Sequence, residues 1–230
     1  MVLDDIGLPE SLLETVVREL ASEYTTSGRV QHEGVVYQPT RIIDAWRFNV
    51  NVHAIARSKK VLALLRELYG REPLPFQTLN FRVGTEQSVH SDALHFNSMP
   101  PGYMCGVWVA LEDIDLGNGP LIYYPGSHKL PEVTMQELGA EPSYDDYPKY
   151  ERHIAELIER EGLEPEYGTI RKGQALLWAS NLLHGGAPQR DRNRTRHSQV
   201  THYFFEGCKY YTPMRSTETE PHWRDPNWVA

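Results

Sequence analysis

The sequence predicts a mainly β protein with flanking helices, in which short strands form a sandwich or barrel. Before about residue 75, apolar residues recur at three- and four-residue spacing, as on the buried face of a helix. After that point, short β-rich runs alternate with Gly, Pro and Asp, which is typical of strands joined by turns. A length of 230 residues suits one large β unit. We therefore expect a single domain over 1–230, with a helical lead-in over 1–75 and a β core over 76–205.

Two amphipathic helices are predicted in the lead-in. The first covers residues 9–24, and its apolar face consists of Leu12, Leu13, Val16, Val17, Leu20 and Ala21. The second covers residues 58–69, because Ser58 can cap its N-terminus and Gly70 can end it. Between the two, residues 30–38 indicate a short hairpin or a loop.

The core is expected to contain β-rich runs over 76–83, 102–111, 121–124, 175–179 and 198–205. An insertion over 131–168 interrupts this order and carries a helical pattern of its own. A long insertion between barrel strands either packs on the core or forms a lid over its mouth. Residues 206–230 are expected to form a C-terminal tail.

Composition narrows the function classes. The chain has 23 basic and 31 acidic residues, a net charge of -8, so nucleic acid is not an expected partner. Cys105 and Cys208 are far apart in sequence, which indicates free thiols in a reducing compartment. No signal peptide or run of eighteen apolar residues is present. We expect a cytoplasmic protein that binds a small molecule and no membrane, and its oligomeric state stays unknown.

Three separated residues form a candidate metal site. In an extended chain alternate side chains share a face, so His90 and Asp92 can reach the same point. His184 follows an apolar run far downstream, and Gly185-Gly186 would let the backbone pass closely behind it. Two histidines and one carboxylate on one side of an ion are the ligand set of non-haem Fe(II) oxygenases, which leaves positions for a cosubstrate and O₂.

A second signal lies in the last predicted strand, where Arg196 and Ser198 share a face. A guanidinium group binds a carboxylate through two parallel hydrogen bonds, and a hydroxyl adds another. A dicarboxylate such as 2-oxoglutarate could therefore chelate the metal at one end and be anchored by Arg196 at the other.

The combined order of these motifs resembles the phytanoyl-CoA dioxygenase family of Fe(II)/2-oxoglutarate oxygenases, over roughly residues 76–205. The matching segments are Leu79-Asn80-Phe81, His90-Ser91-Asp92, Asn118-Gly119-Pro120-Leu121, Pro125-Gly126-Ser127-His128-Lys129, His184-Gly185-Gly186 and Arg196-x-Ser198. The resemblance implies a double-stranded β-helix (jelly-roll, cupin-like) core, with His90, Asp92 and His184 as metal ligands and Arg196 and Ser198 at the cosubstrate. It also implies that Asn80 lies near the cosubstrate. Arg194 is an alternative to Arg196, because the spacing from His184 is one residue longer than in the members compared.

The resemblance further implies a dioxygenase that uses Fe(II), 2-oxoglutarate and O₂ to hydroxylate a small polar metabolite or biosynthetic intermediate, with release of succinate and CO₂. Desaturation, ring closure or epimerisation would use the same residues. Two alternatives remain: a cupin-type zinc hydrolase or isomerase, and a non-catalytic binding module on the same barrel. The candidate substrate contacts are His95, Asn97, Tyr103 and Tyr123. Trp178 and His202 are expected to pack in the core.

Overall fold

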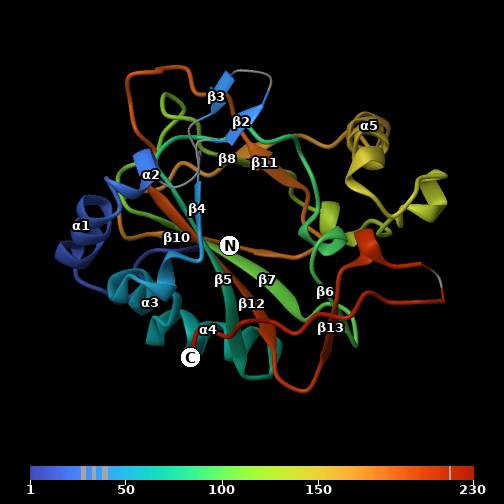
Figure 1. Cartoon of the computed structure of the whole chain (residues 1–230), viewed down its shortest axis with the longest axis horizontal. Helices are drawn as coiled ribbons and strands as arrows, with labels where there is room; N and C mark the ends of the chain where they lie inside the picture. Colours follow the sequence, from blue (N-terminus) through green and yellow to red (C-terminus); the bar gives the residue numbers. More distant parts are fainter. Residues whose placement is uncertain (27–29, 33–34, 38–40, 218) are drawn as a thin grey trace.

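The largest sheet has the strand order β1-β10-β7-β12-β5-β4, and its neighbouring strands are antiparallel (Figure 1). Its strands are β1 (Val2–Leu3), β4 (Arg41–Ile43), β5 (Pro73–Phe81), β7 (Met104–Ala110), β10 (Ala175–Ala179) and β12 (Ser198–Phe205). The computed structural model describes residues 1–230 except 27–29, 33–34, 38–40 and 218. All five predicted β-rich runs overlap a strand, and two of these strands, β10 and β12, have the predicted bounds.

A smaller sheet completes a jelly-roll sandwich. It has the order β11-β8-β9, with β11 (His184–Gly186), β8 (Leu121–Tyr123) and β9 (Glu166–Tyr167). Apolar side chains from both sheets pack between them, Trp108, Leu176 and Val200 from the large sheet against Leu121. Because side chains alternate along a strand, the neighbouring positions of the large sheet face the other way.

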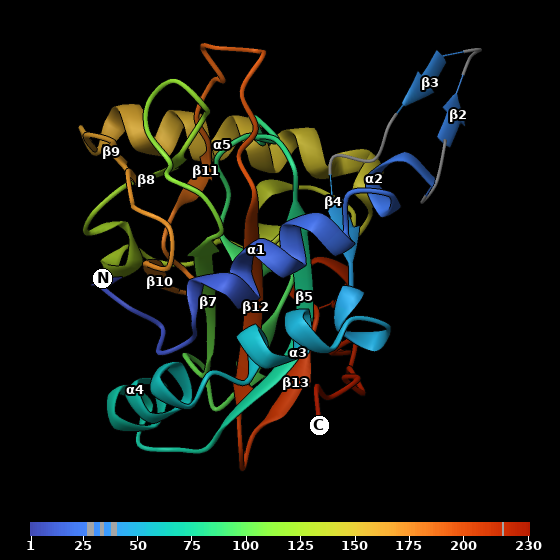
Figure 2. The ribbon, with the colours of Figure 1, turned by 90° about the vertical axis from the view of Figure 1, so that its left-hand side faces the viewer.

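Helices cover that other face of the large sheet, as Figure 2 shows for α1 and α3. The helices are α1 (Glu10–Glu19), α2 (Glu23–Thr26), α3 (Val50–Ala56) and α4 (Lys59–Tyr69). Leu13, Val52 and Leu65 pack in one buried cluster with Val107 and Phe205 of the sheet. The helices therefore close one side of the sandwich and leave the interior between the sheets for a site.

The helix ends follow local chemistry. The Oγ atom of Ser58 accepts a hydrogen bond from the Val61 amide at 3.2 Å, and Gly70 ends α4 with a φ of 66°, so both predicted ends are confirmed. The stretch predicted as one helix over 9–24 is divided, because α1 ends at Glu19. Helix α3 was not predicted, and the Asn49 side chain caps it by accepting from two amides.

The remaining elements sit around the sandwich. A hairpin forms from β2 (Val30–His32) and β3 (Val35–Tyr37), as predicted for 30–38, although its turn and residue 38 lie outside the described residues. The insertion over 131–168 contains α5 (Tyr147–Arg160), and most of its apolar residues pack in a separate cluster with Leu94 and Leu183. No helix in the described ranges is both long and apolar enough to cross a membrane.

The C-terminal segment, residues 206–230, packs against the sandwich although a tail was expected. Strand β13 (Lys209–Tyr211) pairs with β6 (Asn97–Met99), and an isolated bridge joins Tyr211 to Trp223. The amide of Val229 donates to the Pro75 carbonyl at 2.9 Å. The C-terminal segment is therefore anchored both at β6 and at β5.

Candidate active site

Backbone pairing brings two of the predicted metal ligands together. The amide of His90 donates to the carbonyl of His184 at 2.9 Å, and the amide of His184 donates to the carbonyl of His90 at 3.0 Å. Residues paired in this way have neighbouring side chains. The two imidazole rings lie with their centroids 4.6 Å apart. A separation of more than ninety residues in sequence is thus closed by two hydrogen bonds.

Asp92 completes the group. Ser91 between it and His90 is extended, with φ -110° and ψ 130°, so the side chains of His90 and Asp92 share one side. His90 Nε2 lies 3.7 Å from Asp92 Oδ1, and His184 Nε2 lies 3.7 Å from Asp92 Oδ2. The ligand atoms of His90, Asp92 and His184 all lie within 4.8 Å of one another. One ion about 2.1 Å from each ligand atom fits such gaps.

Hydrogen bonds fix which nitrogen of each histidine is free. Nδ1 of His90 donates to the Ser88 carbonyl at 2.9 Å, and Nδ1 of His184 donates to the Leu182 carbonyl at 2.9 Å. A carbonyl oxygen can only accept, so both rings carry a proton on Nδ1, and Nε2, the nitrogen 3.7 Å from an Asp92 oxygen, is the atom left to bind a metal. Metal-binding histidines are typically oriented by such a bond from the other ring nitrogen.

Electrostatics favour the ligand states that a metal requires. Burial lowers the pKa of His184 to about 4, so the ring is neutral at pH 7. Burial alone would raise the pKa of Asp92, but the surrounding His184, His90 and His202 rings lower it well below the usual range. The site therefore holds a neutral His184 imidazole and an ionised Asp92 carboxylate, the forms in which these groups bind a divalent cation.

Trp178 orients the carboxylate of Asp92 through a hydrogen bond. Its Nε1 donates to Asp92 Oδ2 at 2.8 Å, and its ring centroid lies 4.8 Å from that of His184. Gly106 on the neighbouring strand makes room for the indole, since a Cβ there would lie 2.2 Å from a ring carbon of Trp178. Glycine at position 106 thus leaves the space in which Trp178 bonds to Asp92.

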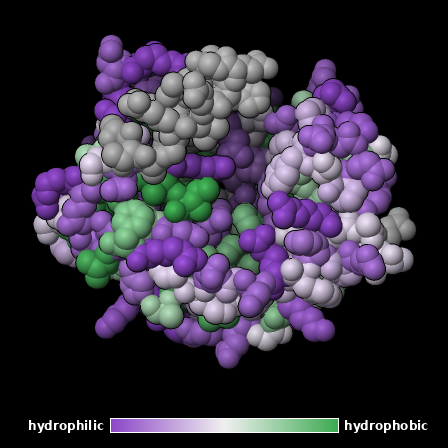
Figure 3. Space-filling model, in the orientation of Figure 1, coloured by the Kyte–Doolittle hydropathy of each residue, from purple (hydrophilic) through white to green (hydrophobic). Residues whose placement is uncertain are grey.

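His90, Asp92 and His184, called the metal group below, line a cavity of about 410 Å³ between the sheets. In the view of Figure 3 the surface is hollowed beside the part of the molecule that carries α5, and mostly hydrophilic side chains surround the hollow. Arg196 lies in the cavity wall and is only 5% exposed. Its guanidinium carbon lies 5.3 Å from the ring centroid of Phe81 and 5.4 Å from that of Trp108.

The guanidinium of Arg196 has unused donors. Nη2 makes one long hydrogen bond, 3.4 Å, to the Val83 carbonyl, and Nε has no partner among the described residues. Burial lowers the pKa of Arg196 to about 10, which leaves the group charged at neutral pH. A buried cation without a counter-ion is costly, so this wall suits an anionic ligand.

The geometry separates Arg196 from the alternative, Arg194. Arg194 is at the surface, where Nη1 pairs with both carboxylate oxygens of Asp115 at 2.8 and 2.9 Å. Ser198, the other residue expected at the cosubstrate, is fully buried and does not line the cavity, and its hydroxyl donates to the Arg196 carbonyl at 3.4 Å. Of the two arginines, only Arg196 lines the cavity that holds the metal group.

A family model described as phytanoyl-CoA dioxygenase (PhyH) matches residues 18–198. The chain belongs to this family. A phytanoyl-CoA dioxygenase domain-containing protein 1 of Danio rerio is 32% identical over 181 residues, which are 73% of this chain and 58% of that protein. An ectoine dioxygenase of Nocardia farcinica is 26% identical over 211 residues, 81% of this chain and 67% of that protein. A Mus musculus phytanoyl-CoA dioxygenase domain-containing protein 1 is 31% identical over 134 residues, 56% of this chain but only 38% of that protein.

Solved structures of Fe- and 2-oxoglutarate-dependent enzymes share the fold. EctD from S. alaskensis with 2-oxoglutarate and 5-hydroxyectoine aligns at a TM-score of 0.68 and 19% identity, over 99% of this chain and 80% of that chain. The epimerase SnoN in complex with Fe3+, alpha ketoglutarate and nogalamycin RO aligns at a TM-score of 0.69 and 16% identity, over 100% and 93%. The predicted jelly-roll core is confirmed by these likenesses.

Asn80, which the resemblance placed near the cosubstrate, does not reach the cavity. The cavity-facing residues of β5 are Gln77, Leu79 and Phe81, and Asn80 lies between two of them on the opposite face. Its Nδ2 donates to Gln199 Oε1 at 3.2 Å, toward the helical layer. The structure therefore corrects the assignment of Asn80, because strand alternation turns its side chain away.

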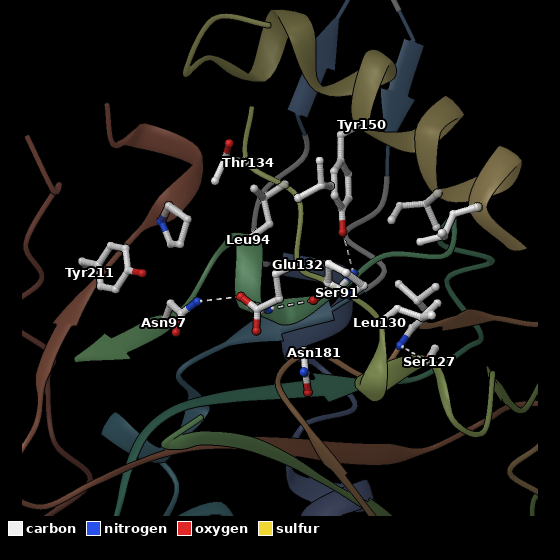
Figure 4. Close-up of a pocket in the computed structure, with 17 residues that line it drawn as sticks. Ser91, Leu94, Asn97, Ser127, Leu130, Glu132, Thr134, Tyr150, Asn181 and Tyr211 are labelled. Carbon is white, nitrogen blue, oxygen red and sulfur yellow. Dashed lines mark hydrogen bonds between the residues drawn. The ribbon is translucent and has the colours of Figure 1, made fainter. Parts of the chain in front are cut away.

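Only one of the predicted substrate contacts, His95, lines the cavity. Tyr103 instead packs with the helical cluster, and the Tyr123 hydroxyl donates to Glu166 at 2.8 Å. Asn97 lines a separate, smaller cavity of about 90 Å³, where its Nδ2 donates to Glu132 at 3.1 Å (Figure 4). The side chains of Asn97, Tyr103 and Tyr123 therefore do not line the cavity that contains the metal group.

The sequence reasoning missed several residues of the site. Trp178 was expected only to pack, but it binds Asp92. His202 is buried as expected, and its Nε2 also lies 3.6 Å from Asp92 Oδ2 in the cavity wall. His202 follows Arg196 by an even number of residues, and this spacing in the sequence indicated that both side chains face the cavity. Further wall residues come from the lead-in, the insertion and the C-terminal segment: Arg41, Tyr144, Tyr147, Thr212, Arg215 and Arg224.

Proposed function

We propose that this chain is an Fe(II)- and 2-oxoglutarate-dependent oxygenase that hydroxylates a small molecule, with release of succinate and CO₂. One observation carries the proposal: a buried group of two histidines and one carboxylate shares a cavity with a charged arginine that has unused donors. Membership of the phytanoyl-CoA dioxygenase family supports it. So do the folds of EctD, solved with 2-oxoglutarate, and SnoN, solved with Fe3+ and alpha ketoglutarate.

His90, Asp92 and His184 would hold the iron. Their donor set of two imidazole nitrogens and one carboxylate suits non-haem Fe(II), and all three lie on one side, so positions toward the cavity stay open. When bound, iron(II) supplies the chemistry with O₂ that amino-acid side chains lack. The protein's own contribution is to fix the ligands in place, through the Nδ1 bonds of both histidines and the indole of Trp178.

Arg196 would anchor the distal carboxylate of 2-oxoglutarate. The guanidinium lies against Phe81 and Trp108, and these rings exclude water and strengthen a charge-assisted contact. Such contacts contribute about 1.5–3 kcal/mol for each hydrogen bond to a charged group. Arg196 therefore orients the cosubstrate while taking no direct part in the reaction.

Binding of 2-oxoglutarate tests this without knowledge of the substrate. Calorimetric titration of 2-oxoglutarate into the Fe(II)-loaded chain, without O₂, should show binding that disappears when the metal is removed. Arg196→Gln should weaken it at least about tenfold, a loss of about 1.4 kcal/mol. Arg194→Gln is the matched control, because Arg194 lies outside the cavity, and it should bind like the wild type.

Turnover adds the second half of the test. Under air, with Fe(II) and a pool of candidate metabolites, the wild type should convert 2-oxoglutarate to succinate, and Asp92→Ala should not. A zinc hydrolase or isomerase of cupin type would bind zinc with no affinity for 2-oxoglutarate. A non-catalytic module would bind a small molecule and form no succinate. Either result would reject the proposal.

A further inference from the structure

Three arginines besides Arg196 line the cavity. They are Arg41, Arg215 and Arg224, and Asp92, the proposed metal ligand, is the one acidic residue among the described lining residues. This distribution is unexpected in a chain with a net charge of -8. None of the three arginines forms an ion pair with a described residue. These arginines give the cavity an excess of positive charge, which a bound divalent metal would increase.

Arg224 is held in place but has a free donor. Its backbone amide donates to the Tyr210 carbonyl at 2.8 Å, and Nη1 donates to Thr212 Oγ1 at 2.9 Å. Its guanidinium carbon lies 4.8 Å from the ring centroid of Phe96. Nε is buried without a partner among the described residues. The group is therefore oriented by two contacts, while its charge stays uncompensated.

Arg215 belongs to the same segment as Arg224 and also lines the cavity. Its guanidinium carbon lies 5.8 Å from the ring centroid of Tyr144, in the insertion that precedes α5. Burial and the neighbouring positive charge of Arg215 both lower the pKa of Arg224. Two like charges so placed repel each other, and an anion between them would remove that cost.

Aromatic rings connect this cluster to the metal group. Arg224 lies over Phe96, the Phe96 ring centroid is 5.3 Å from that of His202, and His202 Nε2 is 3.6 Å from Asp92. Tyr147 also lines the cavity, and its hydroxyl is 3.3 Å from His95 Nε2. A molecule held by the arginines would thus place an apolar or aromatic body beside these rings, with its reacting carbon toward the metal.

We propose that the substrate carries a carboxylate or phosphate group, which Arg224 and Arg215 bind, with Arg41 adding positive charge across the cavity. This inference rests on the proposed function, since it names the class of molecule that the oxygenase takes. It also assigns a role to the C-terminal segment, which supplies both binding arginines. The charged group fixes the substrate at one end, and the aromatic wall directs the other end to the metal group.

Matched pairs of acids and neutral analogues test the proposal. The probes are 3-phenylpropanoate against 3-phenylpropanamide, and phenyl phosphate against phenol. Each is titrated by calorimetry into the full chain loaded with Mn(II) and 2-oxoglutarate without O₂, so that Arg196 is already occupied, and again into the chain without metal or cosubstrate. At least one acid should bind at least about tenfold more tightly than its neutral partner, which corresponds to about 1.4 kcal/mol.

Variants assign that preference to the arginines. Arg224→Gln should reduce it about tenfold, Arg224→Lys should retain part of it, and Arg224→Gln with Arg215→Gln should abolish it. Arg190→Gln is the control, because Arg190 is an exposed arginine outside the cavity lining, and it should leave the preference unchanged. Affinity for 2-oxoglutarate should stay within about threefold in all of them, which shows that the variants are folded.

The outcomes are separable. If no acid is preferred over its neutral partner, or if the preference survives in the double variant, the anionic-substrate proposal is wrong. A wild type that shows no binding of 2-oxoglutarate would instead reject the proposed function, and the titrations without cosubstrate would still decide the role of the arginines. Whichever of the carboxylate and phosphate probes shows the larger preference identifies the charged group.

Discussion

Replacing Trp178 by Phe removes one hydrogen-bond donor from the carboxylate of Asp92 and keeps most of the aromatic contact. The lost bond is 2.8 Å long, buried, and made to a charged acceptor. Such a bond contributes about 1.5–3 kcal/mol, and loss of a group that orients a metal ligand typically lowers affinity about 10- to 100-fold. We therefore expect Trp178→Phe to weaken Co(II) or Fe(II) binding by at least about tenfold, measured by anaerobic calorimetry.

Trp108→Phe provides the matched control for this change. Trp108 is also buried in the cavity wall, but its Nε1 has no partner among the described residues. The two variants remove similar volumes, so a loss of metal affinity that comes from packing would appear in both. Metal affinity in Trp108→Phe should stay within about threefold of the wild type. Equal affinities in Trp178→Phe and the wild type would refute the positioning role of Trp178.

Three further predictions concern close packing and pH. Gly106→Ala should lower the free energy of unfolding by about 1–3 kcal/mol in denaturant titration, because its Cβ would lie 2.2 Å from the Trp178 ring; an unchanged midpoint would contradict this. Gly185→Ala should weaken metal binding at least about tenfold, since its Cβ would lie 2.7 Å from the Gln87 carbonyl oxygen and displace β11; wild-type affinity would count against it. Burial lowers the pKa of His95 to about 4. As the pH falls, the unfolded chain therefore binds this proton before the folded chain does. The free energy of unfolding should decrease by up to about 3 kcal/mol between about pH 6.5 and pH 4. His95→Gln should flatten that dependence, and parallel pH profiles for the two proteins would rule out the contribution.

Apolar runs predicted the buried strands well. Strand β10 is almost entirely buried, and a continuous apolar run marks its full length. Strand β12 is also buried, but it contains four polar residues, and its Val, Thr, Tyr and Phe content marked it as a strand. Strands β1 and β4 escaped detection because they have two and three residues, too few for any period to be visible. Helix α3 has only seven residues, and its start depends on the Asn49 side chain.

Strand alternation explains which site predictions agree with the geometry. It placed His90 with Asp92, because the residue between them is extended although neither lies in a strand. It did not place Ser198 in the cavity, which Arg196 lines and Ser198 does not. Asn80 was transferred by resemblance alone and lies on the wrong face of β5. A shift of one position turns a side chain to the other side of a sheet, so a motif match without its register cannot place such a residue.

Contacts between distant segments could not be read from the sequence. Arg224 reaches the cavity because the C-terminal segment folds back on its own strand β13, where the Arg224 amide donates to Tyr210, and because the Val229 amide donates to Pro75 of β5. Trp178 reaches Asp92 because Gly106 leaves space on the adjacent strand. Both depend on chain segments that meet only after the sandwich has formed, and local periodicity carries no information about them.

X-ray diffraction from crystals grown without O₂ in Fe(II) and 2-oxoglutarate, recorded on both sides of the iron absorption edge, tests the metal assignment most directly. We expect one anomalous peak about 2.0–2.2 Å from Nε2 of His90, Nε2 of His184 and a carboxylate oxygen of Asp92. The distal carboxylate of 2-oxoglutarate should lie on Arg196. An iron peak bound by other residues, or none between these three, would contradict the assignment.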